Sequence, residues 1–294
     1  MKLSIITINY NNAVGLKKTF DSVASQTSTE FEHIIVDGAS TDDSVDIIRE
    51  YSQSPTAICH KITWCSEPDS GIYNAMNKGI EIALGRRVVN SINHSLLAEN
   101  QEQGVITTKR NYLLFLNSGD ILVDENVVCD FLKSDKKEDI VAGGILQGFN
   151  NLQPKYPPQK LTFELFVNDS LMHPATFIRR DLFERYGLYN EQHKIVSDWE
   201  FFIKVLINNN CTYTTIDRLI SVFDTTGISN QSAYSILHVQ ERNEVINDKM
   251  SYLKPVYDEL MERRQICNEY KFLKDGRLGC IIELCLKLKS MKRK

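Results

Sequence analysis

The chain has 294 residues, of which 42% are hydrophobic and 24% charged, and its formal net charge is −4. These values are typical of a soluble globular protein with a sizeable core, and they exclude a strongly basic protein that binds nucleic acid. The seven cysteines form neither a C-x-x-C pair nor zinc-ligand spacing, so reduced thiols are expected. Because no stretch has the length of a membrane span or a signal-peptide core, we expect a cytoplasmic protein.

Four apolar stretches in the first 120 residues each predict a buried strand that ends in polar residues. They are "KLSIITINYNN", "HIIVDGASTDD", "CHKITWCSEPDSG" and "NYLLFLNSGD". Apolar residues at helical spacing predict helices between them, over 14–25, 43–53 and from 72 to a stop at Gly85. This alternation indicates an α/β fold with a mostly parallel, Rossmann-like central sheet and flanking helices. The polar strand ends should line one crevice, where ligands bind in such sheets.

The motifs that hold nucleotides through glycine-rich loops are absent. There is no G-x-G-x-x-G after the first strand and no G-x-x-x-x-G-K-[ST] anywhere, which argues against a dehydrogenase or a P-loop enzyme. The polar strand ends are instead rich in acids, and acids hold a diphosphate only through a divalent cation. For Asp37 alone, a simple Asp-Gly turn is the alternative.

The four blocks named above, in this order, closely resemble family 2 of the nucleotide-sugar glycosyltransferases, which are inverting enzymes with the GT-A fold. The resemblance continues through "MHPATFIRRDLFERYGLYNE" and "SDWEFFIKVL" and covers roughly residues 1–230. Within the family, the chain looks most like the colanic acid, capsule and O-antigen type. The resemblance implies a GT-A domain over 1–230, with a donor half up to about 120 and an acceptor half from 121.

For the donor, the resemblance implies that Asp37 hydrogen-bonds the nucleotide base, with UDP favoured, and that Thr7 and Asn9 flank the base and ribose. Asp69 would lie near the donor ribose or diphosphate, with Glu67 a weaker candidate. The alternative for Asp69 is a helix N-terminal acid that the helix dipole favours.

The metal motif of the family, D-x-D or D-D, is replaced here by Asn117-Ser118-Gly119-Asp120. By resemblance, Asp120 binds Mg²⁺ or Mn²⁺ and the neighbouring Asn117 and Ser118 contact the donor. Asn117 or water would take the place of the missing acid. The alternative is a plain turn between a strand and a loop.

In the acceptor half, the resemblance makes Asp198 of "SDWEFF" the general base. From the residues alone, Ser197 and Glu200 predict a capping box that places Asp198 in the first turn of a helix. His173 would lie at the floor of the active site or be a core histidine, and Trp199 would stack on a sugar or pack in the core. Glu200 is the neighbouring acid to examine if Asp198 is not the base. The segment "TTGIS" (225–229) resembles the family's G-G-[IV]-S loop near the diphosphate, with Thr226 in place of the first glycine.

Three segments extend this plan. Residues 86–110 form an insertion that includes His94, and residues 231–294 a helical extension with a break at Pro255. The basic amphipathic tail 278–294 would either contact a cytoplasmic membrane surface or pack as a helix.

The expected enzyme transfers a hexose from a nucleotide sugar to a saccharide or lipid-linked acceptor for a surface polysaccharide. The alternatives are a catalytically silent nucleotide-sugar-binding subunit and a nucleotidyltransferase.

Overall fold

The computed structural model describes residues 3–54, 60–87, 89, 111–148, 151–225, 227 and 232–275. Most of the predicted insertion, with His94, lies outside these residues, as do positions 226 and 228–229 of the "TTGIS" segment and the whole tail 278–294. The chain divides into two compact units, residues 1–242 and 243–294. The domain boundary at residue 230 stays a prediction.

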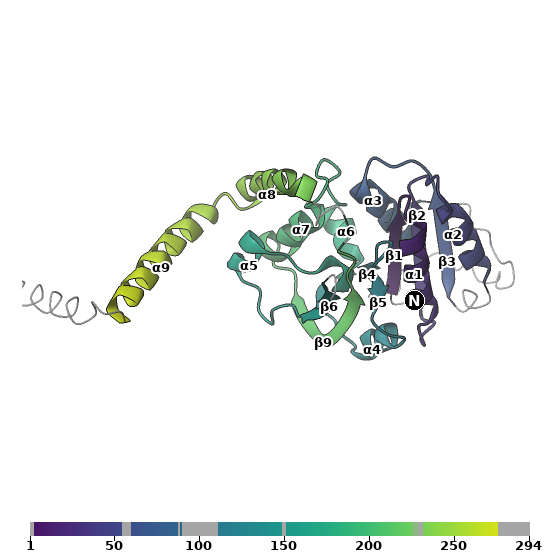
Figure 1. The fold of residues 1–294 in the computed structure, drawn as a ribbon, viewed down its shortest axis with the longest axis horizontal. Helices are drawn as coiled ribbons and strands as arrows, with labels where there is room; N and C mark the ends of the chain where they lie inside the picture. Colours follow the sequence, from purple (N-terminus) through teal and green to yellow (C-terminus); the bar gives the residue numbers. More distant parts are fainter. Residues whose placement is uncertain are drawn as a thin grey trace, which may run out of the picture. The chain divides into compact units, whose positions relative to one another are not determined.

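The first half of unit 1–242 contains four parallel strands in the order β3-β2-β1-β4 (Figure 1). They are β1 (Leu3–Asn9), β2 (Phe31–Asp37), β3 (Lys61–Ser66) and β4 (Tyr112–Phe115). The helices between them are α1 (Ala13–Ala24), α2 (Ser44–Gln53) and α3 (Ile72–Ala83). The three helices lie within about two residues of their predicted ranges, and each strand overlaps the apolar part of the stretch that predicted it.

Alternate residues of β2 cover the two faces of this sheet, because side chains of a strand point to opposite sides. Ile35 packs with Leu16 and Phe20 of α1 and with Ile48 of α2. The opposite face receives α3, whose Gly79 lies so close to Ile6 of β1 that a Cβ at this position would approach Ile6 Cγ2 to 2.6 Å. The absence of a side chain at Gly79 therefore lets α3 pack directly on the strands whose ends bear Asn9 and Asp37.

The second half of the unit makes the sheet mixed. Strand β8 (Thr176–Arg179) is antiparallel to β4, β6 (Ile140–Gln147) is antiparallel to β8, and β9 (Tyr213–Val222) is parallel to β6. Two short strands, β5 (Ile121–Leu122) and β7 (Gln153–Lys155), pair with β9 and β6. The helical elements here are α4 (Val127–Lys133), α5 (Phe163–Asn168), η2 (His173–Ala175), α6 (Asp181–Tyr186), α7 (Ser197–Phe202), η3 (Ile203–Asn208) and η5 (Ser232–Tyr234).

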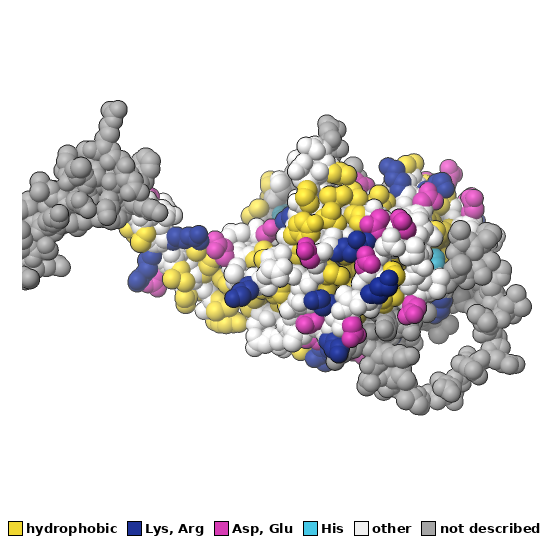
Figure 2. All heavy atoms as spheres, turned by 90° about the horizontal axis from the view of Figure 1, so that it is seen from below, with side chains coloured by type: hydrophobic (Ala, Val, Ile, Leu, Met, Phe, Trp, Pro, Cys, Tyr) yellow, Lys and Arg dark blue, Asp and Glu magenta, His cyan; other side chains and the backbone are white. Residues whose placement is uncertain are grey.

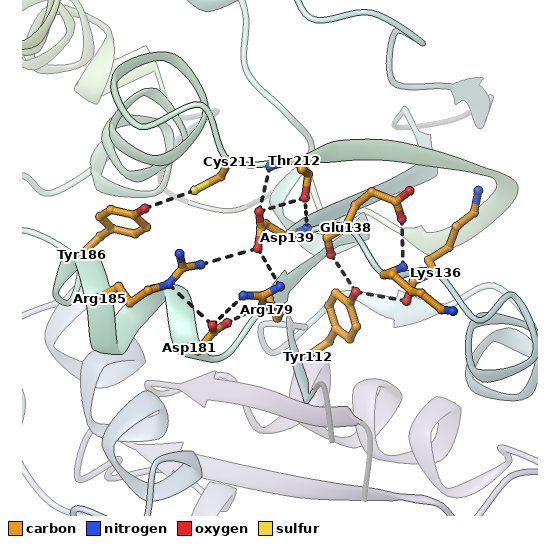
Figure 3. Close-up of polar contacts among 11 residues, drawn as sticks. Tyr112, Lys136, Glu138, Asp139, Arg179, Asp181, Arg185, Tyr186, Cys211 and Thr212 are labelled. Carbon is orange, nitrogen blue, oxygen red and sulfur yellow. Dashed lines mark hydrogen bonds and ion pairs between the residues drawn. The ribbon is translucent and has the colours of Figure 1, made fainter. Parts of the chain in front are cut away.

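An ion network fixes the start of β6 to its neighbours (Figure 3). The Asp139 carboxylate accepts hydrogen bonds from the Thr212 amide and hydroxyl, both at 2.8 Å, and pairs with Arg179 Nη1 at 2.9 Å. Arg179 also forms a two-point contact with Asp181, at 2.5 and 2.6 Å. Bidentate pairs of this kind hold geometry well, so the network joins β6, β8 and the segment that leads into β9.

The remaining helices are α8 (Ser235–Lys249), which begins within unit 1–242, and α9 (Lys254–Asp275). The sequence predicted a break at Pro255; the structure has it just before, at residues 250–253. Pro255 itself lies in the first turn of α9, where proline is tolerated. Among the described helices, none combines the length and apolarity needed to cross a membrane. On the face drawn in Figure 2, basic and acidic side chains are interspersed.

Candidate active site

A cavity of about 710 Å³ opens at the carboxyl ends of the parallel strands. Its walls come from both halves of the sheet: β1 and the loop after it, the start of α3, the β4–β5 turn, η2, the start of α7 and the loop after β9. The predicted site residues on its lining are Asn9, Asp69, Asn117, Ser118, Asp120, His173 and Asp198. The structure therefore brings together residues more than 180 positions apart in the sequence.

Asp37 lies beneath this cavity and organises the strand ends. The β1–β2–β3 register aligns Asn9, Asp37 and Ser66. The fully buried Asp37 carboxylate accepts four hydrogen bonds: from Asn9 Nδ2 (2.8 Å), from Ser66 Oγ (2.7 Å), and from the Ser40 amide (3.0 Å) and hydroxyl (2.6 Å). An ionised carboxylate has about four acceptor positions, so these bonds saturate it. Asp37 thereby orients Asn9, which does line the cavity.

Thr7 also lies beneath the cavity. Its buried hydroxyl donates to the Leu116 carbonyl at 2.7 Å and lies 2.9 Å from His33 Nε2. Burial, and then the neighbouring His60, hold the pKa of His33 well below its ordinary value. Thr7 thus joins β1 to the β4 end within a neutral polar cluster, and the structure does not bring it to the cavity lining.

Asp69 and Glu67, the two acids after β3, have different surroundings. Asp69 lines the cavity, accepts from the Gly71 amide at 3.0 Å, and lies against Gly38, where a Cβ would collide with its carboxylate. Glu67 contacts Lys78 Nζ at 2.8 Å and Arg87 Nη2 at 2.5 Å, and the Lys78 hydrogen bond is the largest cause that lowers its pKa. The carboxylate of Glu67 is therefore held in ion pairs with Lys78 and Arg87, whereas Asp69 lines the cavity.

Asp120 is a buried carboxyl group at the end of the β4–β5 turn. It is 3% exposed, and one of its oxygens accepts the Asp224 amide at 2.8 Å. Burial raises the pKa of Asp120 to about 7, and the negative charge of Asp224 adds to the rise. Such a carboxyl group is poised to exchange its proton for a cation.

Asp224 is a site residue that the sequence reasoning missed. It follows the end of β9, lines the cavity, and packs on Gly119, which has φ +106° and no room for a side chain. The signal was available, because "ISVFD" is a strand followed by an acid, like the four stretches in the first half.

The side-chain oxygens gathered around Asp120 fit a hard divalent cation as its ligands. Asp120 and Asp224 supply two carboxylates, and the buried Oδ1 of Asn117 has no hydrogen-bond partner. Mg²⁺ and Mn²⁺ prefer oxygen ligands of this kind and commonly take the others from water and substrate phosphates. Within the part of the chain that the structure describes, no group of three or more His, Cys, Asp or Glu side chains forms a metal site.

Asp198 lies in the first turn of α7, as the sequence predicted. The predicted capping box of Ser197 and Glu200 is not formed, so that prediction is wrong. The residue before the helix is Val196, and Ser197 is already helical, with its hydroxyl accepting the Asn190 amide at 2.6 Å. Asp198 Oδ1 instead accepts a hydrogen bond from the Tyr73 hydroxyl at 2.8 Å, across the cavity from α3. The acid is thus held by a residue from the donor half.

The three remaining predicted residues surround Asp198. His173 lines the cavity, stacks on Phe115 and bonds the Tyr189 hydroxyl at 2.9 Å; burial lowers its pKa and keeps it neutral. Trp199 is in the core, with Nε1 donating to the Phe166 carbonyl at 2.9 Å. Glu200 is buried beside His193 Nδ1 at 2.9 Å. Of the three, only His173 faces the cavity.

Comparison with known proteins agrees with this geometry. Residues 4–193 match Glycosyl transferase family 2. A PGL/p-HBAD biosynthesis glycosyltransferase of Mycobacterium tuberculosis is 29% identical over 212 residues, 70% of each chain. An uncharacterized glycosyltransferase of Haemophilus influenzae is 25% identical over 253 residues, 79% of this chain and 74% of the relative.

Solved structures show the same fold. Residues 1–349 of S. aureus TarS, in complex with UDP-GlcNAc, superpose with a TM-score of 0.57 at 19% identity, covering 80% of this chain and 62% of that 1–349 chain. The mannosyltransferase PcManGT of Pyrobaculum calidifontis, in complex with GDP-Man and Mn²⁺, gives 0.57 at 14% identity, covering 85% and 64%. The chain therefore spans less than two thirds of these solved chains.

A mixed α/β sheet with flanking helices and an acidic cavity at its strand ends defines a GT-A glycosyltransferase fold. Since the family match spans more than half of the sequence, this chain belongs to Glycosyl transferase family 2.

Proposed function

We propose that this chain transfers a sugar, with inversion, from a nucleoside diphosphate sugar to a saccharide or lipid-linked saccharide in the synthesis of a cell-surface polysaccharide of the colanic acid, capsule or O-antigen type. The proposal rests on one observation: the same cavity is lined by a pair of neighbouring acids that could bind a metal ion and by a separate acid that could act as a base. Asp120 and Asp224 lie beside each other, with the Asp224 amide donating to the Asp120 carboxylate, and Asp198 lines the same cavity from the start of α7. Transfer with inversion needs a charge-stabilised leaving group on one side of the sugar and a base on the other.

On the donor side, Asn9, Asp69 and Ser118 would contact the nucleotide and ribose, while Asp37 and Thr7 shape that pocket from below. Asp120, Asp224 and Asn117 would hold Mg²⁺ or Mn²⁺, which neutralises the charge that develops on the departing diphosphate. The match to a UDP-GlcNAc complex supports UDP as the first nucleotide to test, and the match to a GDP-Man complex makes GDP the second.

On the acceptor side, Asp198 would accept the proton of the attacking hydroxyl. The Tyr73 hydroxyl holds Oδ1 of this carboxylate at 2.8 Å, and Oδ2 would take the proton of the acceptor. The neutral His173 would contribute polar contacts at the cavity floor without adding charge. A cytoplasmic location, with tail 278–294 on the inner membrane surface, stays a prediction from the sequence.

A panel of UDP, GDP and dTDP sugars, incubated with the protein, Mn²⁺ and saccharide acceptors, tests this function. We expect release of the nucleoside diphosphate, fastest with a UDP sugar, and dependence on added metal. Release of pyrophosphate would indicate a nucleotidyltransferase instead. Donor binding without any release, measured by a rise in Tm that follows mass action, would indicate a silent binding subunit and contradict the proposal.

A further inference from the structure

Helix α8 reaches back to the loop that precedes Asp198. Its residue Glu241 is only 4% exposed, and its carboxylate accepts two backbone hydrogen bonds, from the Lys194 amide at 2.7 Å and from the Ile195 amide at 3.0 Å. Burying a carboxylate is costly unless hydrogen bonds compensate for the lost water. Bonds from N–H groups to a charged acceptor are about twice as strong as neutral ones. Glu241 therefore fixes the backbone three and four residues before Asp198.

The same peptide segment continues the connection to the acid. The Ile195 carbonyl lies 2.7 Å from the Tyr73 hydroxyl, and that hydroxyl also lies 2.8 Å from Asp198 Oδ1. Tyr73 is 4% exposed, and burial raises its pKa well above the ordinary value, so its hydroxyl stays protonated and can act as a donor. Because a hydroxyl has one proton, Tyr73 can bond Asp198 when the acid is ionised and the Ile195 carbonyl when it is not.

A second residue of α8 contacts Trp199, the residue that follows Asp198. The Arg242 guanidinium lies over the Trp199 ring, 4.1 Å from its centroid, and donates to the carbonyls of Phe166 (3.2 Å) and Val167 (3.1 Å). Trp199 Nε1 donates to the same Phe166 carbonyl. Adjacent residues of α8 thus hold the chain before and after Asp198.

We propose that Glu241 is a positioning residue for Asp198, acting through the 194–195 backbone and the Tyr73 hydroxyl. This inference rests on the proposed role of Asp198 as the base. It gives α8, which carries no family motif in the sequence, a part in the reaction. A base must lie within hydrogen-bond reach of the hydroxyl it deprotonates, and displacement by about 1 Å can cost about a hundredfold in rate.

The first test is kinetic and uses Glu241→Gln, which keeps the shape but offers one acceptor oxygen in place of two. We expect kcat for transfer to fall about ten- to a hundredfold while the donor KM stays near wild type. Tyr73→Phe should behave similarly, and the double variant should be little slower than the slower single variant, because both act through one path. The control is Glu244→Gln, the same change at an exposed position of α8, which should keep wild-type kinetics.

The second test needs no activity, so it separates failure of this inference from failure of the proposed function. Hydrogen exchange of the 190–198 peptide should become faster by about tenfold or more in Glu241→Gln and stay at the wild-type rate in Glu244→Gln. Wild-type exchange in Glu241→Gln, or additive losses of kcat in the double variant, would overturn the inference. Faster exchange throughout residues 3–225 would also overturn it, since Glu241 would then only stabilise the fold.

Discussion

Asp198→Asn is expected to lower sugar transfer by about a hundred- to ten-thousandfold while donor and metal binding stay near wild type. The amide has nearly the shape of the carboxylate, and its oxygen can still accept the Tyr73 hydroxyl, which lies 2.8 Å from Oδ1 in the wild type. What the amide lacks is the ability to take a proton from the acceptor. Measured kcat together with donor Kd, from a thermal or calorimetric titration, separates this loss from a binding defect.

A matched control for this change is Asp217→Asn, at an exposed aspartate of β9 that does not line the cavity. It should keep wild-type kcat, and circular dichroism of all variants should match the wild type. Normal transfer by Asp198→Asn would make Asp198 only a helix-terminus acid. The base would then have to be sought elsewhere, although Glu200, the nearest alternative in sequence, is held beside His193.

Asp120→Asn should show a different pattern, because it removes a proposed metal ligand. Donor affinity in Mn²⁺ should fall together with kcat, by tenfold or more, and a higher Mn²⁺ concentration should recover part of both. Asp224→Asn should give a smaller effect in the same direction. Titration of donor binding at several Mn²⁺ concentrations measures this, and a donor affinity unaffected by either the variant or the metal would rule out the proposed role.

The metal-free protein gives a second readout for Asp120. Burial raises its folded-state pKa to about 7, whereas the unfolded carboxyl group releases its proton near the ordinary value of 3.8. Between these values the folded state binds more protons, so this group makes the protein less stable as pH rises, by at most about 1.4 kcal/mol per pH unit, with no further change above about pH 7. Asp120→Asn should remove this contribution, and urea unfolding across the pH range would detect the difference.

Local sequence patterns predicted the donor half of the fold well. Strand β2 and helix α3 were identified from apolar periodicity and from the stop at Gly85, which has φ +69° as a helix-terminating glycine often does. The parallel direction of strands β1 to β4 was predicted from the alternation of strands and helices. The mixed second half of the sheet could not be predicted in this way. The antiparallel insertion of β8 beside β4 depends on long-range pairing that no local pattern encodes.

In the site, too, the features that follow from local motifs were predicted and those that depend on tertiary packing were not. Asp69, Asp120 and Asp198 lie on the cavity as predicted, because each follows a strand end or begins a helix in a recognisable block. Thr7, Asp37 and Trp199 come from the same blocks but are buried and do not line the cavity, a difference that side-chain packing decides. The contacts of Glu241 with the Asp198 loop could not be foreseen, since they join segments 46 and 47 residues apart in sequence.

The central claim is that Asp198 acts as the base of an inverting transfer in this cavity, and the anomeric configuration of the product tests it most directly. Wild-type protein would be incubated with the preferred donor and Mn²⁺, and the first product followed by ¹H NMR, before any free sugar equilibrates. We predict a configuration opposite to that of the donor, because in the proposed mechanism the base activates the acceptor hydroxyl for attack from the face away from the diphosphate. A product that retains the donor configuration would contradict this account.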